Sequence, residues 1–436
     1  MKRLPRWFRL AVVIIVFVII SLYSIYQFLI NPYRGTTNKY IVTLPLETEL
    51  TKKQVLKDID YVIGKLRERH PAWLEKENKR VDAVEAKYSD MRKMINDDEK
   101  DCYTVLEEWQ IISRIMNQLY DGHSRVNCYS DSKKYIDDFS QINEYGNPIA
   151  INDEPTEKII ESFLNLFQYE RAEFAQAEFK EYIKNELYLN WLGVNTSNGV
   201  TFKFATDSGE KEYHYTFVPY ENVKNNDVED SEWINYEIEK NENLAIFTLK
   251  ECDYNDLYVN TVNEFFDKVY SENIENIIVD LRGNGGGNSY VANEFLSHLD
   301  IDGYSGWSAD VRYGNFLMHS EPYYYKVEKK ENAYKGKVFI LTDVFTYSSA
   351  MDFAMLFKDN NLGTIVGEAS GNMPESYGDV LSFTVPNSKL AFSVSYKKWH
   401  RIDQSKCDEP IKPDYECKSQ IALDYAKQLI VEKKYE

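Results

Sequence analysis

Two short segments of the sequence contain residue types that acyl transfer requires. The first, residues 282–288, reads RGNGGGN and follows the apolar stretch IIVDL. Glycines before a helix expose several backbone N–H groups toward one point. A dinucleotide site would need glycine or alanine where Asn288 stands, and a phosphate-binding loop would need Gly-Lys-Ser/Thr. The remaining chemical interpretation is an oxyanion hole, since a plain turn rarely needs four glycines in five positions.

The second segment, residues 347–353, reads YSSAMDF and lies between the strand-like VFILTD and a predicted helix. A serine at a helix start, here Ser349, holds its hydroxyl near the positive end of the helix dipole. The amide that follows it, on Ala350, can join an oxyanion hole. Ser349 and Asp352 also match an ordinary helix-capping pair. The combination with the glycine loop favours Ser349 as a nucleophile, because acyl transfer requires both parts.

Alternating strands and helices must position these two segments. From residue 243 onward the sequence predicts strands at LAIFTL, IIVDL, VFILTD and TIVGE, with helices at about residues 257–270, from 290 and at 349–358. This alternation indicates an α/β layer with a substantially parallel sheet. Sites in such sheets form at the carboxyl ends of the strands, and both segments fall there.

Upstream, the spacing of apolar residues predicts two amphipathic helices. One covers residues 51–70 and stops at His70, because Pro71 disfavours a helical conformation in the residue before it. The other covers about residues 105–119 and leads directly into Asp121-Gly122-His123-Ser124. Residues 131–243 are acidic and combine strand-like and helix-like stretches, which indicates a small mixed region.

The stretch ENIIVDLRGNGGGNS resembles the I-I-D-L-R-x-N-x-G-G signature of the tail-specific, or C-terminal processing, peptidase family, together with the tricorn-core proteases. KVFILTDVFTYSSAMDFAMLFKDNNLGTIVGE resembles that family's nucleophile strand, serine helix and V-G-E strand. Residues 408–414 resemble its closing G-V-x-P-D element. The resemblance covers about residues 244–420 and implies a ClpP/crotonase-like α/β catalytic core. GNPIAINDEPTEKII resembles a degenerate PDZ-like segment.

By this resemblance Ser349 takes the nucleophile position, and the amides of Gly286 and Ala350 form the oxyanion hole. The Ser-Lys branch of the family carries its lysine shortly after the V-G-E strand, but residues 369–373 read ASGNM here. The resemblance therefore points to the serine-histidine branch, whose base lies far upstream. His123 matches that position among six histidines, and an imidazole can accept a proton around neutral pH.

A third group should orient the base, as in other catalytic triads. Ser124, beside His123, and an acidic residue before Pro410 resemble the other members of the tricorn tetrad. Glu409 is the predicted carboxylate. Asp408 is the alternative at that position, and Glu368 is a further candidate.

The amino terminus has the features of a membrane anchor. Lys2, Arg3, Arg6 and Arg9 precede the uncharged, apolar residues 10–30, and about 20 apolar residues span a bilayer as a helix. A cleaved signal peptide is the alternative, but SLYSIYQFLINPYRG offers no small-residue cleavage site. Positive charge on the amino-terminal side of this segment favours a cytoplasmic location for residues 1–9. The sequence thus predicts a single-pass cell-membrane protein with its catalytic region on the outer face.

Charge and cysteine content exclude few other classes. The net charge of −19, from 51 Lys plus Arg against 70 Asp plus Glu, disfavours nucleic acid as a partner. Cys407 and Cys417 could close a local loop outside the cell, and free thiols are the alternative. No zinc-site spacing and no H-E-x-x-H occurs, so no metal and no cofactor is implied.

Residues and resemblance together predict a membrane-anchored serine peptidase that cleaves proteins or peptides through an acyl-enzyme on Ser349, with His123 as general base. The alternative is a catalytically inactive family member that acts as an extracellular ligand-binding or scaffold protein. The predicted organisation is a cytoplasmic tail at 1–9, a transmembrane helix at 10–30, a linker and helical segment at 31–130, a mixed, PDZ-like region at 131–243 and the catalytic core at 244–436.

Overall fold

The carboxy-terminal half of the protein is built around a six-stranded sheet. The computed structural model describes residues 5–39, 41–225 and 232–433. The strand order is β10-β11-β12-β17-β18-β21, in which β10 is antiparallel to β11 and all other neighbours are parallel. This order confirms the predicted α/β layer. The strands are β10 (Ile234–Glu239), β11 (Leu244–Leu249), β12 (Asn276–Asp280), β17 (Lys337–Thr342), β18 (Thr364–Gly367) and β21 (Tyr415–Glu416).

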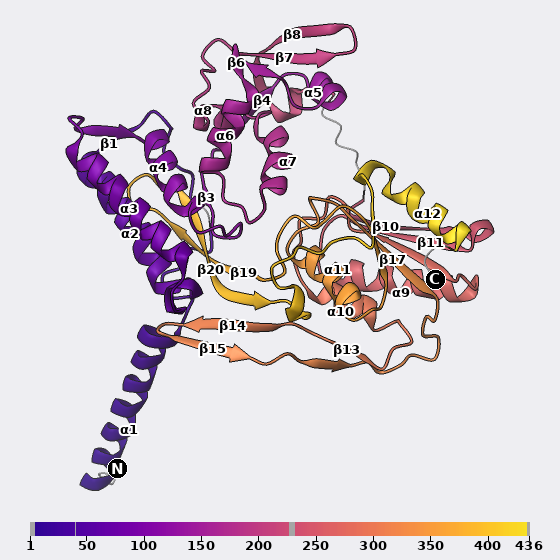
Figure 1. The fold of residues 1–436 in the computed structure, drawn as a ribbon. Helices are drawn as coiled ribbons and strands as arrows, with labels where there is room; N and C mark the ends of the chain where they lie inside the picture. The colour runs from indigo at the N-terminus through magenta and orange to yellow at the C-terminus, as the bar shows by residue number, and fades with distance from the viewer. Residues whose placement is uncertain (1–4, 40, 226–231, 434–436) are drawn as a thin grey trace.

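Helices cover both faces of this sheet (Figure 1). In β12, Ile277 and Val279 pack in one core with α9, α10 and α11, whereas Ile278 packs in another core with α12. Burial on both faces explains why these strands read as continuous apolar runs in the sequence. The helices are α9 (Asp256–Ser271), α10 (Tyr290–Leu296), α11 (Ser349–Asp359) and α12 (Ala422–Glu432).

The glycine loop and the serine turn leave the sheet side by side. They follow β12 and β17, which are parallel neighbours with Asp280 opposite Leu341. The amide of Leu281 continues this pairing by donating to the carbonyl oxygen of Leu341 at 3.0 Å. Both segments therefore lie at the carboxyl ends of adjacent strands, as the sequence predicts.

The two predicted amphipathic helices are present. The first begins after Thr51, whose side chain forms a capping box with Gln54, and it ends at His70, before Pro71. The second begins with a capping box of its own. The elements of this helical segment are β1 (Glu49–Thr51), α2 (Lys52–Arg69), α3 (Lys79–Asp97), β2 (Cys102–Thr104) and α4 (Val105–Asn117), with β1 and β2 paired.

An antiparallel sheet connects this helical segment to the carboxy-terminal half. Its order is β15-β14-β20-β19, and β3, which follows the His123 loop, pairs with β20. A second ribbon pairs β13 with β16. These strands are β3 (Val126–Asn127), β13 (Gly303–Ser305), β14 (Ser308–Tyr313), β15 (Phe316–Ser320), β16 (Tyr324–Lys326), β19 (Ser376–Thr384) and β20 (Ala391–His400).

The turn between β19 and β20 is fixed on the helical segment by buried carboxylates. The carboxylate of Asp58, on α2, accepts from the amides of Asn387 and Ser388 at 3.0–3.1 Å. The hydroxyl of Ser388 donates to Glu108, on α4, at 2.6 Å. Burial is the main reason why the pKa of Asp58 is raised. This docking brings residues far apart in the sequence to one site.

Residues between the two halves form a mixed region that packs on α4. A four-stranded antiparallel sheet has the order β6-β5-β7-β8, and β4 pairs with β9. Its helices share one core with α2 and α4, and α6 and α7 lie to the right of α4 in Figure 1. The elements are β4 (Lys134–Ile136), α5 (Ser140–Tyr145), β5 (Ala150–Ile151), β6 (Glu154–Pro155), α6 (Thr156–Leu166), α7 (Ala172–Tyr182), α8 (Glu186–Trp191), β7 (Val200–Thr206), β8 (Gly209–Tyr215) and β9 (Phe217–Pro219).

One apolar helix projects from the body of the protein at the amino terminus (Figure 1). It comprises α1 (Arg6–Ile25) and a π-helical continuation, Tyr26–Ile30. Among the described residues, this is the one helix that is both long enough and apolar enough to cross a membrane. A signal sequence would have the same properties. Lys2 and Arg3 of the predicted tail lie outside the described residues. All five cysteines are free, so Cys407 and Cys417 form no bridge.

The buried pair of Arg401 and Asp359 fixes the end of β20 to the end of α11, with both side chains at most 1% exposed. We expect Arg401→Met to lower the free energy of unfolding of the full chain in detergent by about 3–5 kcal/mol, because it leaves a buried carboxylate unpaired. Arg67→Met removes the exposed pair with Glu85 and should cost no more than about 1 kcal/mol. Urea unfolding compares the two variants, and equal losses would contradict this assignment.

Candidate functional site

The turn between β17 and α11 holds Ser348 in an unusual backbone conformation. Its φ is +51° and its ψ is −123°, a region that favours glycine. The amide of Ser348 donates to Oδ1 of Asn372 at 2.9 Å, and its carbonyl oxygen accepts from the amide of Asp352 at 2.9 Å. Such a strained strand-to-helix turn projects its side chain away from the sheet.

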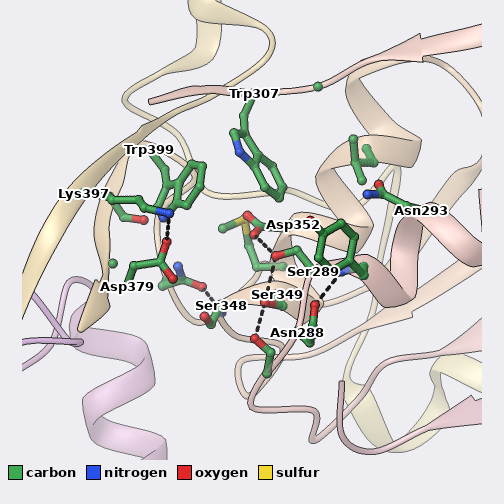
Figure 2. Close-up of a pocket in the computed structure, with 18 of the residues that line it drawn as sticks. Asn288, Ser289, Asn293, Trp307, Ser348, Ser349, Asp352, Asp379, Lys397 and Trp399 are labelled. Atoms are coloured by element: carbon green, nitrogen blue, oxygen red, sulfur yellow. Dashed lines mark hydrogen bonds and ion pairs between the residues drawn. The ribbon is translucent and has the colours of Figure 1, made fainter. Parts of the chain in front are cut away.

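The structure pairs His123 with Ser348. Its Nε2 lies 3.1 Å from Oγ of Ser348, within hydrogen-bond distance. Ser349, the serine expected as nucleophile from the sequence, points elsewhere: its hydroxyl donates to the carbonyl oxygen of Gly287 at 2.9 Å and lies 3.0 Å from Oγ of Ser289. Figure 2 shows the contact between Ser349 and Ser289 as a dashed line. The serine next to His123 is therefore Ser348, one residue before Ser349, which the sequence analysis predicts.

A carboxylate from the mixed region lies on the other side of His123. Oε1 of Glu170 is 3.7 Å from Nδ1 of His123, and neither atom has a hydrogen-bond partner although both are buried. Oε2 of Glu170 is held by the amide of Met373 at 2.9 Å. Closing the gap to a hydrogen bond requires about 0.5–1 Å of movement. Ser348, His123 and Glu170 therefore have the linear order of a catalytic triad.

The pKa of His123 is raised above its ordinary value. Burial alone would lower it, but the hydrogen-bonding capacity and negative charge of Glu170, with the charge of Asp121, outweigh that effect. A histidine that gains a proton more readily is a stronger base. The environment of His123 thus favours proton uptake from a neighbouring hydroxyl.

Asp121 fixes the loop that carries His123. Its Oδ1 accepts from the amide of His123 at 2.9 Å, and its Oδ2 accepts from Oγ of Ser395 at 2.7 Å and lies 3.1 Å from Nε2 of His70. Since Nδ1 of His70 accepts from the amide of Ala72, its Nε2 carries the hydrogen that faces Asp121. Burial would raise the pKa of Asp121, but His70 and His123 hold that pKa below its usual range.

Ser124, expected beside the base, has a structural position. Its hydroxyl accepts from the amide of Ser395 at 2.9 Å and donates to Oγ of Ser395 at 3.3 Å. It is fully buried and lies next to Asp121 in this network. Ser124 therefore supports the loop and faces β20.

The amides predicted for the oxyanion hole have other acceptors in this structure. Gly286 N donates to Oδ1 of Asn284 at 2.8 Å, and Ala350 N donates to the carbonyl oxygen of Tyr347 at 3.1 Å. With Ser348 as the reacting residue, the next amide is that of Ser349, at the first position of α11. The loop lies close to this turn, since a Cβ on Gly286 would be 2.7 Å from Cβ of Ser348 and 2.8 Å from N of Ser349.

The acidic residues predicted from the closing motif do not face His123. Glu409 pairs with Lys412 at 3.2 Å and is 45% exposed. Asp408 is exposed, and Oε1 of Glu368 accepts from the amide of Ser419 at 3.2 Å. Glu170 takes the place expected for these residues, although no sequence motif surrounds it. The sequence signal for this difference is the presence of two adjacent serines, 348 and 349, either of which could face His123.

Two clusters of side chains have the composition of a metal site. Asp121, His123 and Glu170 lie within 4.8 Å of one another, but both oxygens of Asp121 already accept hydrogen bonds and Nε2 of His123 faces a serine. These contacts occupy both carboxylate oxygens of Asp121 and Nε2 of His123, atoms that would otherwise be available to a metal ion. The second cluster is Asp310, His319 and His400, on the antiparallel sheet.

The His123 and Ser348 pair lies between two cavities. One, of about 550 Å³, extends toward Ser289, Asp352 and two tryptophans (Figure 2). The other, of about 630 Å³, is lined by Arg125 and by the aromatic rings of residues 174, 345 and 347. His123 and Ser348 line both cavities. An extended chain could therefore occupy both sides of the serine hydroxyl.

Comparison with known proteins gives one family match and several similar solved structures. Residues 245–417 match the model of peptidase family S41. No curated protein matches the chain. Among solved structures, mature CPAF has a TM-score of 0.65 at 12% identity, with 87% of this chain and 97% of that chain covered. Mature CPAF complexed with lactacystin has a TM-score of 0.64 at 11% identity, with 87% and 98% covered.

At these identities the CPAF structures show a shared fold, which extends beyond the segment matched by the family model. The match itself includes the glycine loop, the serine turn and the V-G-E strand. Residues 245–417 therefore match peptidase family S41, and the protein is a serine-type peptidase.

Proposed function

We propose that the protein hydrolyses peptide bonds with Ser348 as nucleophile, His123 as general base and Glu170 as the group that orients His123. The observation that carries this proposal is the 3.1 Å distance between Nε2 of His123 and Oγ of Ser348. Oγ attacks the peptide carbonyl carbon while Nε2 takes its proton, and His123 then protonates the leaving amine. Water, activated by His123, hydrolyses the resulting acyl-enzyme.

Two features support stabilisation of the tetrahedral intermediate. The amide of Ser349 stands at the positive end of the α11 dipole, and the glycine loop is in close contact with it. Gly286 can supply a second donor once its amide leaves Oδ1 of Asn284, a change that substrate binding would have to drive. In this mechanism the hydroxyl of Ser349, the expected nucleophile, has no chemical step, and Ala350 is replaced by Ser349 as the amide donor.

The substrates are proteins or peptides, and we propose that the catalytic region faces outward from a cell membrane. The exposed apolar helix Arg6–Ile30 with the basic residues before and within it supports an anchor with its amino terminus in the cytoplasm. For the core we propose a ClpP/crotonase-like architecture that also includes β10, which begins at Ile234. The region between the halves remains a PDZ-like proposal, with domain limits close to residues 131 and 243.

An inactive ligand-binding member of the family is the second candidate function. The amide of Gly286 is occupied and Nδ1 of His123 lacks a hydrogen bond, and both observations fit a site without activity. An inactive protein would gain nothing from a strained serine directed at a buried histidine, however. We therefore favour catalysis, and labelling of the serine separates the two functions.

Ser348→Ala should abolish fluorophosphonate labelling and lower kcat/KM for peptide hydrolysis by at least about 10³-fold, because it removes the attacking oxygen. The matched variant Ser349→Ala should still label, with kcat/KM within about tenfold of the wild type, because its backbone amide is retained. The measurements use the full chain in detergent. Loss of labelling in Ser349→Ala alone would return the nucleophile to Ser349, and absence of labelling and hydrolysis in the wild type would support the inactive binding protein.

Glu170→Gln should reduce kcat by about 10²–10⁴-fold and move the acidic limb of the kcat/KM profile to lower pH. His123 must be neutral to act, so activity is lost as the pH falls through its raised pKa. Removing the charge of Glu170 leaves burial as the dominant influence and therefore lowers that pKa. Glu173→Gln, at a carboxylate 66% exposed, is the control and should leave the limb unchanged. An unmoved limb in Glu170→Gln would exclude Glu170 as the orienting group.

A further inference from the structure

Asp352 is a carboxylate inside the cavity that the proposed mechanism does not use. It lies on the first turn of α11, one turn beyond Ser348, and Oδ2 accepts from Oγ of Ser289 at 3.3 Å (Figure 2). Among the described residues, no lysine or arginine nitrogen lies within 4 Å of it. A carboxylate removed from water without a cation costs free energy. A cation that enters the cavity from outside the chain would offset this cost.

Two carboxylates line the described part of the cavity, and one of them has an ion-pair partner within the chain. Asp379 pairs with Lys397 at 2.7 Å, and Lys397 also lies 4.9 Å from the ring of Trp399. His123, the other basic group of the lining, faces Glu170. Asp352 therefore has no ion pair among the described residues, although the charge of His123 acts on it from a distance and partly lowers its pKa.

The walls of the cavity are aromatic. Trp307 and Trp399 meet edge to face with centroids 4.9 Å apart, and Tyr290 and Tyr325 complete the wall. Aromatic faces attract cations, and the carboxylate of Asp352 in the same cavity provides a charged hydrogen-bond acceptor. A cavity of about 550 Å³ has room for a long side chain.

We propose that this cavity is the subsite for a lysine or arginine side chain of the substrate, next to the scissile bond, with Asp352 as its counter-ion. This subsite presupposes the peptidase function proposed above. Asp352 is a specificity-determining residue, because it contacts the substrate side chain and takes no part in bond cleavage. Asn288 and Ser289 connect this subsite to the glycine loop at the reacting carbonyl.

The pH dependence of this preference follows from the burial of Asp352. Burial raises the pKa of Asp352 to about 7. A protonated carboxyl does not attract a cation, so the preference should strengthen as the pH rises through this value. His123 lines the same cavity, and the effect of its charge on catalysis is the same for all substrates. The ratio of kcat/KM for two peptides at one pH removes the effect of His123 on catalysis.

The test compares peptides that differ only in arginine against citrulline, or lysine against norleucine, on either side of the cleaved bond. The full chain should prefer the charged member of one such pair by about tenfold or more at pH values above about 7, and by less below it. Asp352→Asn should still react with fluorophosphonate but cleave both members equally. Asp424→Asn, on an exposed part of α12, makes the same change of charge and should keep the preference.

Three outcomes would overturn the subsite. Cleavage by the wild type with equal rates for both members, or a preference that survives in Asp352→Asn, would reject it while leaving the peptidase function in place. A wild type that neither labels nor cleaves would reject both proposals together.

A separate observation concerns three neighbouring strands of the antiparallel sheet. Asp310 on β14 lies directly opposite His319 on β15 in the register, and His400 ends β20. Nδ1 of His319 is 2.8 Å from Oδ1 of Asp310, and Nε2 of His400 is 3.0 Å from Oδ2. Nδ1 of His400 lies 2.6 Å from Oε1 of Glu375. A histidine that ligates a metal through one nitrogen commonly gives the other N–H to a carboxylate in this way.

We further propose that Asp310, His319 and His400 bind a divalent transition-metal ion of the zinc class, with Glu375 orienting His400. Two imidazoles and one carboxylate suit zinc and leave its fourth position for water. The three ligand atoms lie within 4.8 Å of one another. Trp399 and Ser376 line the 550 Å³ cavity. His400 directly follows Trp399, and Glu375 directly precedes Ser376. A bound ion would fix the strands that form this wall.

Calorimetric titration of the chelator-treated full chain with zinc chloride should reveal one site per chain with micromolar or tighter affinity. His319→Ala and His400→Ala should each abolish this binding, and Glu375→Gln should weaken it by about 10–100-fold. His214→Ala, at an exposed histidine outside the cluster, should bind as the wild type does. Absence of binding, or binding that is lost in His123→Ala but retained in His319→Ala, would overturn the site.

Discussion

The buried carboxylate of Asp121 is the interaction on which the site depends. Three segments donate to it: His70 at the end of α2, the amide of His123, and Ser395 on β20. A buried charge is tolerated only when donors surround it, and removing one of them leaves an uncompensated group. The helical segment and the β19–β20 hairpin must therefore dock together, and their docking directs His123 toward the carboxy-terminal half.

A second constraint acts on the backbone around Ser348. The positive φ of this serine is maintained because its amide binds Asn372 and because the glycine loop lies against it. Asn284 ties the loop to the turn, since its carbonyl oxygen accepts from the amide of Tyr347 and its side chain from Gly286. Glycine is required at 286, where any side chain would collide with the turn.

Gly122 meets the same kind of requirement on the His123 side. A Cβ there would lie 2.1 Å from the hydroxyl of Tyr347, whose ring packs 5.2 Å from the ring of His123. The ring of Tyr347 thus fills the space between the two loops only because residue 122 has no side chain. Ser348 and His123 are thus held by backbone geometry on both sides, in addition to their hydrogen bond.

The sequence predicts the parts of the site that local patterns encode. Alternating apolar runs predict the sheet, capping residues predict the helix that ends at His70, and the two motifs follow neighbouring strands as expected. The sequence does not predict which serine faces His123, because the choice between Ser348 and Ser349 depends on a single φ angle. Glu170 lies in a loop without a motif, and only the docking of α6 and α7 brings it to His123.

The loop at residues 370–373 shows why the mixed region belongs to the site. In the Ser-Lys branch of the family that residues 244–420 resemble, this stretch would supply the base. Here Asn372 holds the amide of Ser348, the amide of Met373 holds Glu170, and the carbonyl oxygen of Ser370 accepts from Arg171. One short loop therefore sets both the nucleophile turn and the position of the orienting carboxylate. In the proposed mechanism the base is a histidine in place of a lysine. The loop then supplies no base, and it positions Ser348 and Glu170 through its hydrogen bonds. The mixed region then contributes an acid to the reaction, and its packing on α4 becomes a condition for activity.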